Sequence, residues 1–188
     1  DIHDTSEPTV VIECTPLPFK ARAHYFRDGM EVVVPSTRRT APDSLTPRAK
    51  THNYMNLMIA HEEVRRQNTN AWAILLDVNG NLCEGVGSNI FIVEDGVIYT
   101  PEDRYVLCGV SRQTAIDLAE AAGLKVVRKD LDLYDAYTAD EAFITSTSFC
   151  IVPVNSFNGI EVGDGTVHGP ITKKITDAYI KFVDHDFV

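Results

Sequence analysis

A lysine and a glutamate stand out as residues that could carry chemistry. Lys50 lies in "PRAKTHNYMN", immediately before a predicted helix. A lysine amine there can form a Schiff base with a carbonyl group, although most loop lysines are solvated. Glu84 lies in "CEGVGSNIF" beside Gly85 and Gly87, which allow the backbone to approach a ligand closely. A carboxylate in such a place could hold a ring nitrogen protonated, and a glycine-rich turn without a ligand is the alternative.

Two further stretches offer donors to an anion. In "LCGVSRQTA", Gly109 precedes a predicted helix whose first turn contains Val110 and Ser111. The free N–H groups at a helix start favour a phosphate, although a serine-capped helix needs no ligand. In "ITSTSFCIVPV", three hydroxyl residues lie between two apolar segments: Ser146, Thr147 and Ser148. They could complete a phosphate site or form a strand-end turn.

The elements that must position these residues follow from periodicity and turn residues. Strands are expected in five stretches: 9–18, 29–36, 71–77, 89–101 with a turn at Asp95-Gly96, and 125–131. A strand, loop and strand are expected over 141–162, and Asn79-Gly80 favours a further hairpin. Helices are expected in four stretches: 53–67, from Gly109 to Gly123, a helical turn over 134–141, and from Pro170 onward. In the first helix, four residues are expected to share a face: Tyr54, Leu57, Met58 and Val64. Hairpins with interspersed helices predict a mixed α/β or α+β domain.

Composition excludes several classes of function. The chain has 188 residues and a formal charge of −10, which argues against a nucleic-acid partner. No apolar stretch approaches a membrane span. The four cysteines are widely spaced and are expected to be free thiols in a reducing cytoplasm: Cys14, Cys83, Cys108 and Cys150. The six histidines show no metal-ligand spacing, so no metal is expected.

Three blocks together resemble the class IV pyridoxal-phosphate aminotransferases, the family of branched-chain and D-amino-acid aminotransferases. They are "RAKTHNYMN", "EGVGSNIFIVEDGVIYTPEDRYVLCGVSR" and "ITSTSFCIVPV", with support from "GPITKKI". The resemblance covers nearly the whole chain and implies the fold type IV large domain, a mixed β-sheet or pseudo-barrel with flanking helices. Val86 departs from the smaller residue usual in the family, which could alter the floor of the pocket.

The resemblance implies a role for each matching residue. Lys50 resembles the catalytic lysine that binds pyridoxal 5'-phosphate covalently, and Glu84 the acid facing its ring nitrogen. Tyr54 is similar to the tyrosine near the phenolic oxygen, and Leu107 to the apolar residue against the ring. The phosphate positions implied are Gly109, Val110, Ser111, Ser146, Thr147 and Ser148. The substrate pocket would include Gly87, Ser88 and Asn89. Apart from the resemblance, His52 is expected to be structural, with a contact to the site as the alternative. Arg38 and Arg39 are expected to be solvated, with an approach to the site as the alternative.

The resemblance also implies a domain organisation. Residues 1–8 resemble a connection between domains, and residues 9–188 resemble the large cofactor-binding domain. A small N-terminal domain, which would supply an arginine to the phosphate, is expected outside this chain. The family further implies a homodimer or a larger assembly.

The substrates are expected to be an L-branched-chain amino donor and a 2-oxo acid acceptor such as 2-oxoglutarate. The second glycine of "EGVGSNIF" favours this choice, whereas Phe149 and Cys150 replace the small and acidic residues common in branched-chain enzymes. A D-amino-acid or (R)-amine transaminase is the alternative, with an aminodeoxychorismate lyase a more distant one. Two other hypotheses stay open: a non-catalytic binding or oligomerisation module, and a folded fragment that is inert because half of its pocket is absent.

Overall fold

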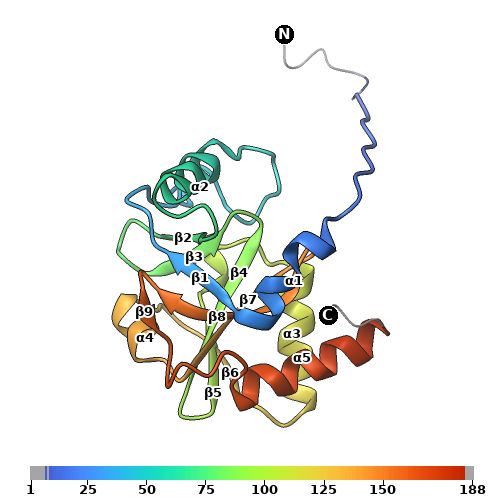
Figure 1. The fold of residues 1–188 in the computed structure, drawn as a ribbon. Coiled ribbons are helices and arrows are strands. Elements are labelled where there is room, and N and C mark those ends of the chain that lie inside the picture. Colours follow the sequence, from blue (N-terminus) through green and yellow to red (C-terminus); the bar gives the residue numbers. More distant parts are fainter. Residues whose placement is uncertain (1–6, 8, 185–188) are drawn as a thin grey trace.

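A closed barrel of six strands forms the centre of the molecule. The structure, a computed structural model, describes residue 7 and residues 9–184 (Figure 1). The strands of the described part are β1 (Met30–Val33), β2 (Trp72–Leu76), β3 (Leu82–Gly85), β4 (Ser88–Glu94), β5 (Val97–Thr100), β6 (Val126–Arg128), β7 (Glu141–Ser146), β8 (Cys150–Phe157) and β9 (Ile160–Glu161). They pair in the order β3-β2-β1-β8-β7-β4, and β3 also pairs with β4, which closes the ring. β5 and β6 extend the sheet from β4, and β9 pairs with β8.

The sheet mixes parallel and antiparallel pairs, as the sequence predicts. β1 is parallel to both β2 and β8, and β5 is parallel to β6. The other pairs are antiparallel. The hairpin from β4 to β5 turns at Asp95 (φ 50°) and Gly96 (φ 77°), and two positive φ values are the geometry that suits the right-handed twist of a hairpin. The mixed fold expected from the sequence is therefore confirmed.

Helices cover the barrel on several sides (Figure 1). They are α1 (Phe19–Asp28), α2 (Met55–Gln67), the short 3₁₀ helix η1 (Asp103–Tyr105), α3 (Val110–Ala121), α4 (Leu133–Thr138) and α5 (Pro170–Val183). α3 and α5 pack on one another and on β7 and β8, where Phe91 and Phe143 stack with ring centroids 4.7 Å apart. Within residues 9–184, no helix is long and apolar enough to cross a membrane.

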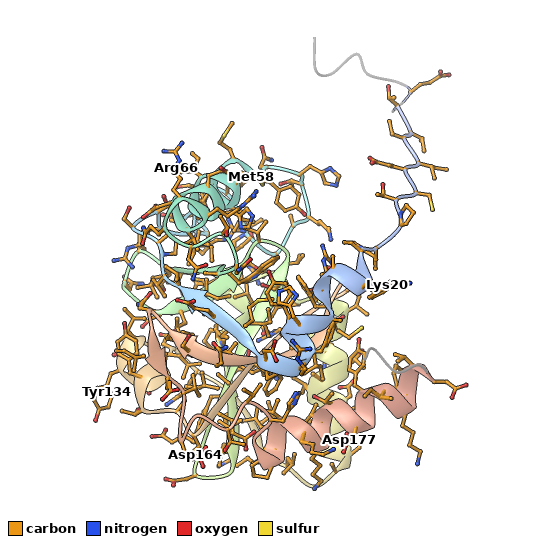
Figure 2. The ribbon with its side chains drawn as sticks, viewed as in Figure 1. Lys20, Met58, Arg66, Tyr134, Asp164 and Asp177 are labelled. Atoms are coloured by element: carbon orange, nitrogen blue, oxygen red, sulfur yellow. The ribbon has the colours of Figure 1, made fainter. Side chains whose placement is uncertain are left out.

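Two local predictions are wrong. The sequence predicts a strand over residues 9–18, but the structure gives them no regular structure, and Ile12 is 92% exposed. Their backbone pairs with no strand of the sheet, and an unpaired strand is not stable in water. In α2, Leu57, Ala60 and Val64 are buried, whereas Met58 is 45% exposed and lies on the outer side of the helix (Figure 2). The buried face is rotated from the predicted one because α2 packs on β2.

Candidate active site

A cavity of about 270 Å³ lies where β3, β4 and β7 meet the loop before α2 and the start of α3. Its volume is near the lower end of small-molecule sites, roughly 300 Å³. Twelve of the predicted site residues line it: Lys50, Tyr54, Glu84, Gly87, Ser88, Asn89, Leu107, Gly109, Val110, Ser111, Ser146 and Thr147. Ser148 is not among the lining residues, and Val86 instead packs against the small cluster of Leu57, Ala60 and Leu75. His52 lines the cavity as well.

Glu84 is a buried carboxylate with two partners. It lies in β3 opposite Asn89 of β4 and is 5% exposed. Its Oε1 accepts a hydrogen bond of 2.9 Å from Arg39 Nε, and its Oε2 accepts one of 2.9 Å from the Leu107 backbone N–H. Burial raises the pKa of Glu84 above its ordinary value, while the Arg39 guanidinium and the Leu107 N–H oppose that rise. The site thus holds a carboxylate whose charge depends on a buried arginine.

The expectation that Arg39 is solvated is wrong. Arg39 is only 8% exposed, whereas Arg38 is exposed at the surface. The irregular loop is held against the barrel because the Arg39 backbone N–H donates to the Leu76 carbonyl over 2.8 Å. This contact turns the guanidinium inward to Glu84, and Arg39 itself lines the cavity.

Lys50 presents an uncommitted amine to the same cavity. It lies in the loop before α2, whose N-cap is Tyr54, and both residues line the cavity. No residue in the described ranges forms a hydrogen bond or an ion pair with the Lys50 side chain. An amine without a partner is available for covalent reaction with a carbonyl group.

The start of α3 has free donors that could bind an anion. Gly109 is the N-cap and no side chain caps the helix, so the first N–H groups of Val110 and Ser111 have no helical partner. A Cβ on Gly109 would lie 2.6 Å from Asn89 Oδ1, so glycine is needed for the close contact there. Across from this helix start, the fully buried hydroxyl of Thr145 lines the cavity and has no hydrogen-bond partner among the described residues. Free amides and an unpaired hydroxyl together fit a phosphate group.

The turn between β7 and β8 uses one predicted phosphate residue for its own structure. Ser146 Oγ accepts from the backbone N–H groups of Ser148 (3.2 Å) and Phe149 (3.1 Å). The Ser148 carbonyl accepts from Arg22 Nη1 of α1 over 3.3 Å. The Ser146 hydroxyl therefore folds the turn that presents Thr147 to the cavity. A phosphate-binding role for Ser146 and Ser148 stays a prediction.

Sequence reasoning missed Arg112, which lines the cavity and holds the segment before Leu107 in place. Its fully buried side chain donates to Asp103 Oδ1 (2.8 Å) and to the Pro101 carbonyl (2.7 Å). These bonds fix the segment that carries Leu107 to the cavity. A signal was available, because an arginine in the first turn of a helix opposes the helix dipole and requires another partner.

The geometry suits one kind of ligand. A free amine, a buried acid and an anion site face a single cavity, and together they match a molecule with a carbonyl group, a basic ring nitrogen and a phosphate. The described residues contain no group of side chains that could hold a metal ion.

Comparison with known proteins gives the family. A model of the family described as amino-transferase class IV matches residues 2–157. A putative branched-chain-amino-acid aminotransferase of Methanocaldococcus jannaschii is 37% identical over 180 residues, which is 95% of this chain and 60% of that protein. The crystal structure of Escherichia coli branched-chain amino acid aminotransferase is similar with a TM-score of 0.81 and 36% identity, over 87% of this chain and 55% of that one.

A third relative was crystallised in its holo-form. The branched-chain amino acid aminotransferase of Thermobaculum terrenum, in its PLP-form, gives a TM-score of 0.78 at 34% identity, over 87% of this chain and 54% of that one. The chain thus spans a little over half the length of these relatives. Since the family model covers most of the chain and the barrel matches solved members, the chain belongs to the class IV aminotransferase family.

Proposed function

We propose that the full-length protein is a pyridoxal-phosphate-dependent aminotransferase that moves an amino group between an L-branched-chain amino acid and a 2-oxo acid such as 2-oxoglutarate. One observation carries the proposal. Lys50, Glu84 and the uncapped start of α3 line the same cavity of about 270 Å³. Three chemically different groups on one small cavity match the aldehyde, ring nitrogen and phosphate of a single cofactor.

Each of the cavity residues would have its own role in the reaction. Lys50 would anchor the cofactor through Nζ and then accept the α-proton of the amino acid as general base. Glu84 would hold a proton on the ring nitrogen, and the Arg39 guanidinium, 2.9 Å from Glu84 Oε1, would favour the ionised form that this task requires. When bound, the cofactor supplies a ring that accepts electron density from the substrate. Tyr54 and Leu107 would contact the phenolic oxygen and the ring face, and the amides of Val110 and Ser111 with the Thr145 hydroxyl would hold the phosphate.

The packing of Phe149 supports a pocket for branched-chain substrates. A phenylalanine in place of a small residue would fill the pocket if its ring pointed into it. Phe149 is instead buried in the barrel, with its ring edge-to-face on Trp72 at 5.0 Å, and it does not line the cavity. Its bulk therefore leaves room for an aliphatic side chain, in agreement with the second glycine, Gly87.

Covalent labelling and a donor panel test the proposal. The full-length protein is incubated with pyridoxal phosphate, reduced with borohydride, digested and examined by mass spectrometry. A pyridoxyl group on Lys50, and none on the exposed Lys20, is expected; an unlabelled Lys50 in folded protein would favour a non-catalytic module. The donors L-Leu, D-Ala and (R)-1-phenylethylamine then separate the substrate classes. Activity on D-Ala alone would refute the L-branched-chain assignment.

Two properties of the whole protein belong to the same proposal. A homodimer is suggested by the family resemblance. A cytoplasmic location is suggested by four cysteines that are all free in the structure, since a reducing compartment keeps thiols unpaired. Sedimentation and cell fractionation would test these two points.

A further inference from the structure

Helix α5 is fixed to the barrel at the strand β7. Its buried residues are Thr172, Ile175 and Tyr179, which are three and four positions apart and therefore share one side of the helix. Glu141, the first residue of β7, accepts hydrogen bonds from the backbone N–H groups of Ile171 (3.0 Å) and Thr172 (2.6 Å). From this start α5 runs across α3 and packs on it (Figure 1). The helix is thus anchored where β7 begins, whereas β7 ends at the cavity.

The hydroxyl of Tyr179 reaches the start of α3. Tyr179 Oη donates a hydrogen bond of 3.3 Å to Ser111 Oγ. Ser111 is the second residue of α3, is 5% exposed and lines the cavity. No residue of α5 lines the cavity itself. Tyr179 therefore contacts the predicted phosphate site indirectly, through the side chain of Ser111.

The same hydroxyl lies beside the turn between β7 and β8. Cys150 is the first residue of β8 and follows the turn that presents Thr147 to the cavity. It packs against the core cluster that contains Tyr179. Burial raises the pKa of the Cys150 thiol, and the neighbouring Tyr179 hydroxyl opposes that rise. Tyr179 thus lies between the two segments that supply predicted phosphate residues, the start of α3 and this turn.

The first turn of α3 depends on anchors outside the helix. Its N-cap is Gly109, and no side chain caps it. Helix ends fray readily, and an uncapped end leaves its first N–H groups without a partner. On the side of η1 the turn is held by Arg112, which donates to Asp103 and to the Pro101 carbonyl. On the side of α5 it is held by the hydrogen bond from Tyr179 to Ser111.

The direction of this hydrogen bond leaves the hydrogen of Ser111 free. Burial raises the pKa of the Tyr179 hydroxyl, which therefore keeps its proton at neutral pH and can donate it. Ser111 Oγ is the acceptor, so its own hydrogen remains to be donated. Among the residues that the structure describes, no group accepts that hydrogen. Because Ser111 borders the cavity, an anionic group of a ligand could accept it.

We propose that Tyr179 is a positioning residue for the phosphate site, and that its hydroxyl holds Ser111, and with it the first turn of α3, in the orientation that binds a phosphate group. The proposal rests on the proposed aminotransferase function and assigns to α5 a part in cofactor binding. Tyr179 would act without touching the cofactor, since it acts through Ser111.

The test compares two ligands that differ in the phosphate alone. The full-length apo-protein is titrated with pyridoxal phosphate and with pyridoxal, and binding is followed by absorbance. The variants are Tyr179→Phe, Ser111→Ala, the double variant, and Tyr137→Phe as a matched control. Tyr137 also uses its hydroxyl in a hydrogen bond, which it accepts from Asn158 Nδ2 over 2.8 Å, but it lies outside the cavity.

Tyr179→Phe should weaken the binding of one ligand and not of the other. The change keeps the buried ring and removes the hydroxyl that holds Ser111. Loss of one neutral hydrogen bond should lower the affinity for pyridoxal phosphate by about threefold to tenfold. The affinity for pyridoxal should stay unchanged, because pyridoxal has no phosphate group. Tyr137→Phe should bind both ligands like the wild type.

The double variant identifies the route of the effect. Ser111→Ala removes the hydroxyl through which Tyr179 acts, so Tyr179→Phe should cause no further loss in that background. Additive losses would overturn the role assigned to Tyr179, because they would show an effect that does not pass through Ser111. The ³¹P resonance of bound pyridoxal phosphate should shift in Tyr179→Phe and stay unchanged in Tyr137→Phe.

Thermal unfolding by circular dichroism verifies that each variant is folded. If Tyr179→Phe is too unstable to titrate, Ser111→Ala tests the same hydrogen bond from its other end and should also lose affinity for pyridoxal phosphate alone. An unchanged affinity for pyridoxal phosphate, or an equal loss for both ligands, would overturn the proposal. Failure of the proposed function looks different, because then the wild type itself would bind pyridoxal phosphate no more tightly than pyridoxal.

Discussion

Removal of Arg39 should destabilise the protein strongly, because it leaves the Glu84 carboxylate buried without a cation. Arg39→Met keeps much of the side-chain volume and removes the charge. The two side chains are 9% and 6% exposed and their Nε and Oε1 atoms are 2.9 Å apart. The remaining donor to that carboxylate would be the Leu107 backbone N–H. A neutral amide donor does not compensate a buried charge.

The magnitude follows from the burial of the pair. Breaking a buried ion pair by removing one partner costs about 3–5 kcal/mol. The Coulomb attraction of unit charges about 4 Å apart at an effective dielectric constant of about 20 is of similar size, about 4 kcal/mol. We therefore expect a loss of about 3–5 kcal/mol in the free energy of unfolding of Arg39→Met near neutral pH. The double variant Arg39→Met/Glu84→Gln should recover part of this loss, because glutamine carries no charge into the core.

The pH dependence has a definite sign. Burial raises the pKa of Glu84 in the folded state above its unfolded value. A carboxyl group with a raised folded pKa takes up its proton more readily in the folded protein, so the stability it contributes is lost as pH rises through the folded pKa. The Arg39 guanidinium lowers the pKa of Glu84, so its removal should raise that pKa further. The defect of Arg39→Met should thus be largest at high pH, where the carboxyl is ionised, and should shrink as the pH falls and the carboxyl takes up its proton.

Urea unfolding of the apo-protein at several pH values, followed by circular dichroism, measures these effects. Arg27→Met is the matched control, since Arg27 pairs with Asp28 on the surface with its side chain 72% exposed. The control should leave the free energy of unfolding nearly unchanged at every pH, because solvent screens this exposed pair. A loss below about 1 kcal/mol for Arg39→Met, or a loss that does not vary with pH, would refute the reasoning that Glu84 is charged and depends on Arg39.

Three further predictions concern the cavity and the thiols. Lys50→Ala should reduce turnover by at least about a hundredfold, and near-normal turnover would contradict the mechanism. Its melting temperature should not change, because the Lys50 side chain is exposed and unpaired among the described residues. Gly109→Ala would place a Cβ 2.6 Å from Asn89 Oδ1, and this close contact should lower the free energy of unfolding by about 1–3 kcal/mol, measured by thermal unfolding. The variant should also bind the cofactor more weakly in a spectral titration, whereas unchanged binding would contradict a role of this helix start. Burial raises the pKa of the Cys83 thiol, so iodoacetamide at about pH 8 should label exposed Cys108 and spare Cys83; equal labelling by mass spectrometry would contradict that burial.

Much of the fold could be predicted because local signals agree with the tertiary structure. Pro170 begins α5, and the Asp95-Gly96 turn connects β4 and β5. The prediction failed for residues 9–18, where β-branched residues suggested a strand. Strand propensity describes how well a residue fits a pleated surface that already has neighbours, and this segment has none in the sheet. Local patterns also could not predict that β3 pairs with β4 and closes the barrel, since a hairpin signal does not indicate which sheet it completes.

The chemical groups of the site could be predicted from the sequence, but the contacts between them could not. Lys50, Glu84 and Gly109 could be singled out because each residue type suits one function at its place in the chain. Arg39 was missed because its role depends on a contact with a residue 45 positions away. Nothing in the local sequence distinguishes it from its neighbour Arg38, which lies at the surface.

A physical rule nevertheless leads from a predicted buried acid to the partner that it needs. If an acid is predicted to lie in a core and to stay ionised, a cation must lie within hydrogen-bonding reach, because the desolvation of a lone carboxylate is too costly. Glu84 meets that condition, and Arg39 is the cation that the fold supplies. The same rule applies to hydroxyl groups: the buried Thr145 hydroxyl has no hydrogen-bond partner among the described residues, and Thr145 lines the cavity that a ligand can enter. The Thr145 hydroxyl thus requires a partner that a ligand can supply, whereas Arg39 supplies the partner of Glu84 from within the protein.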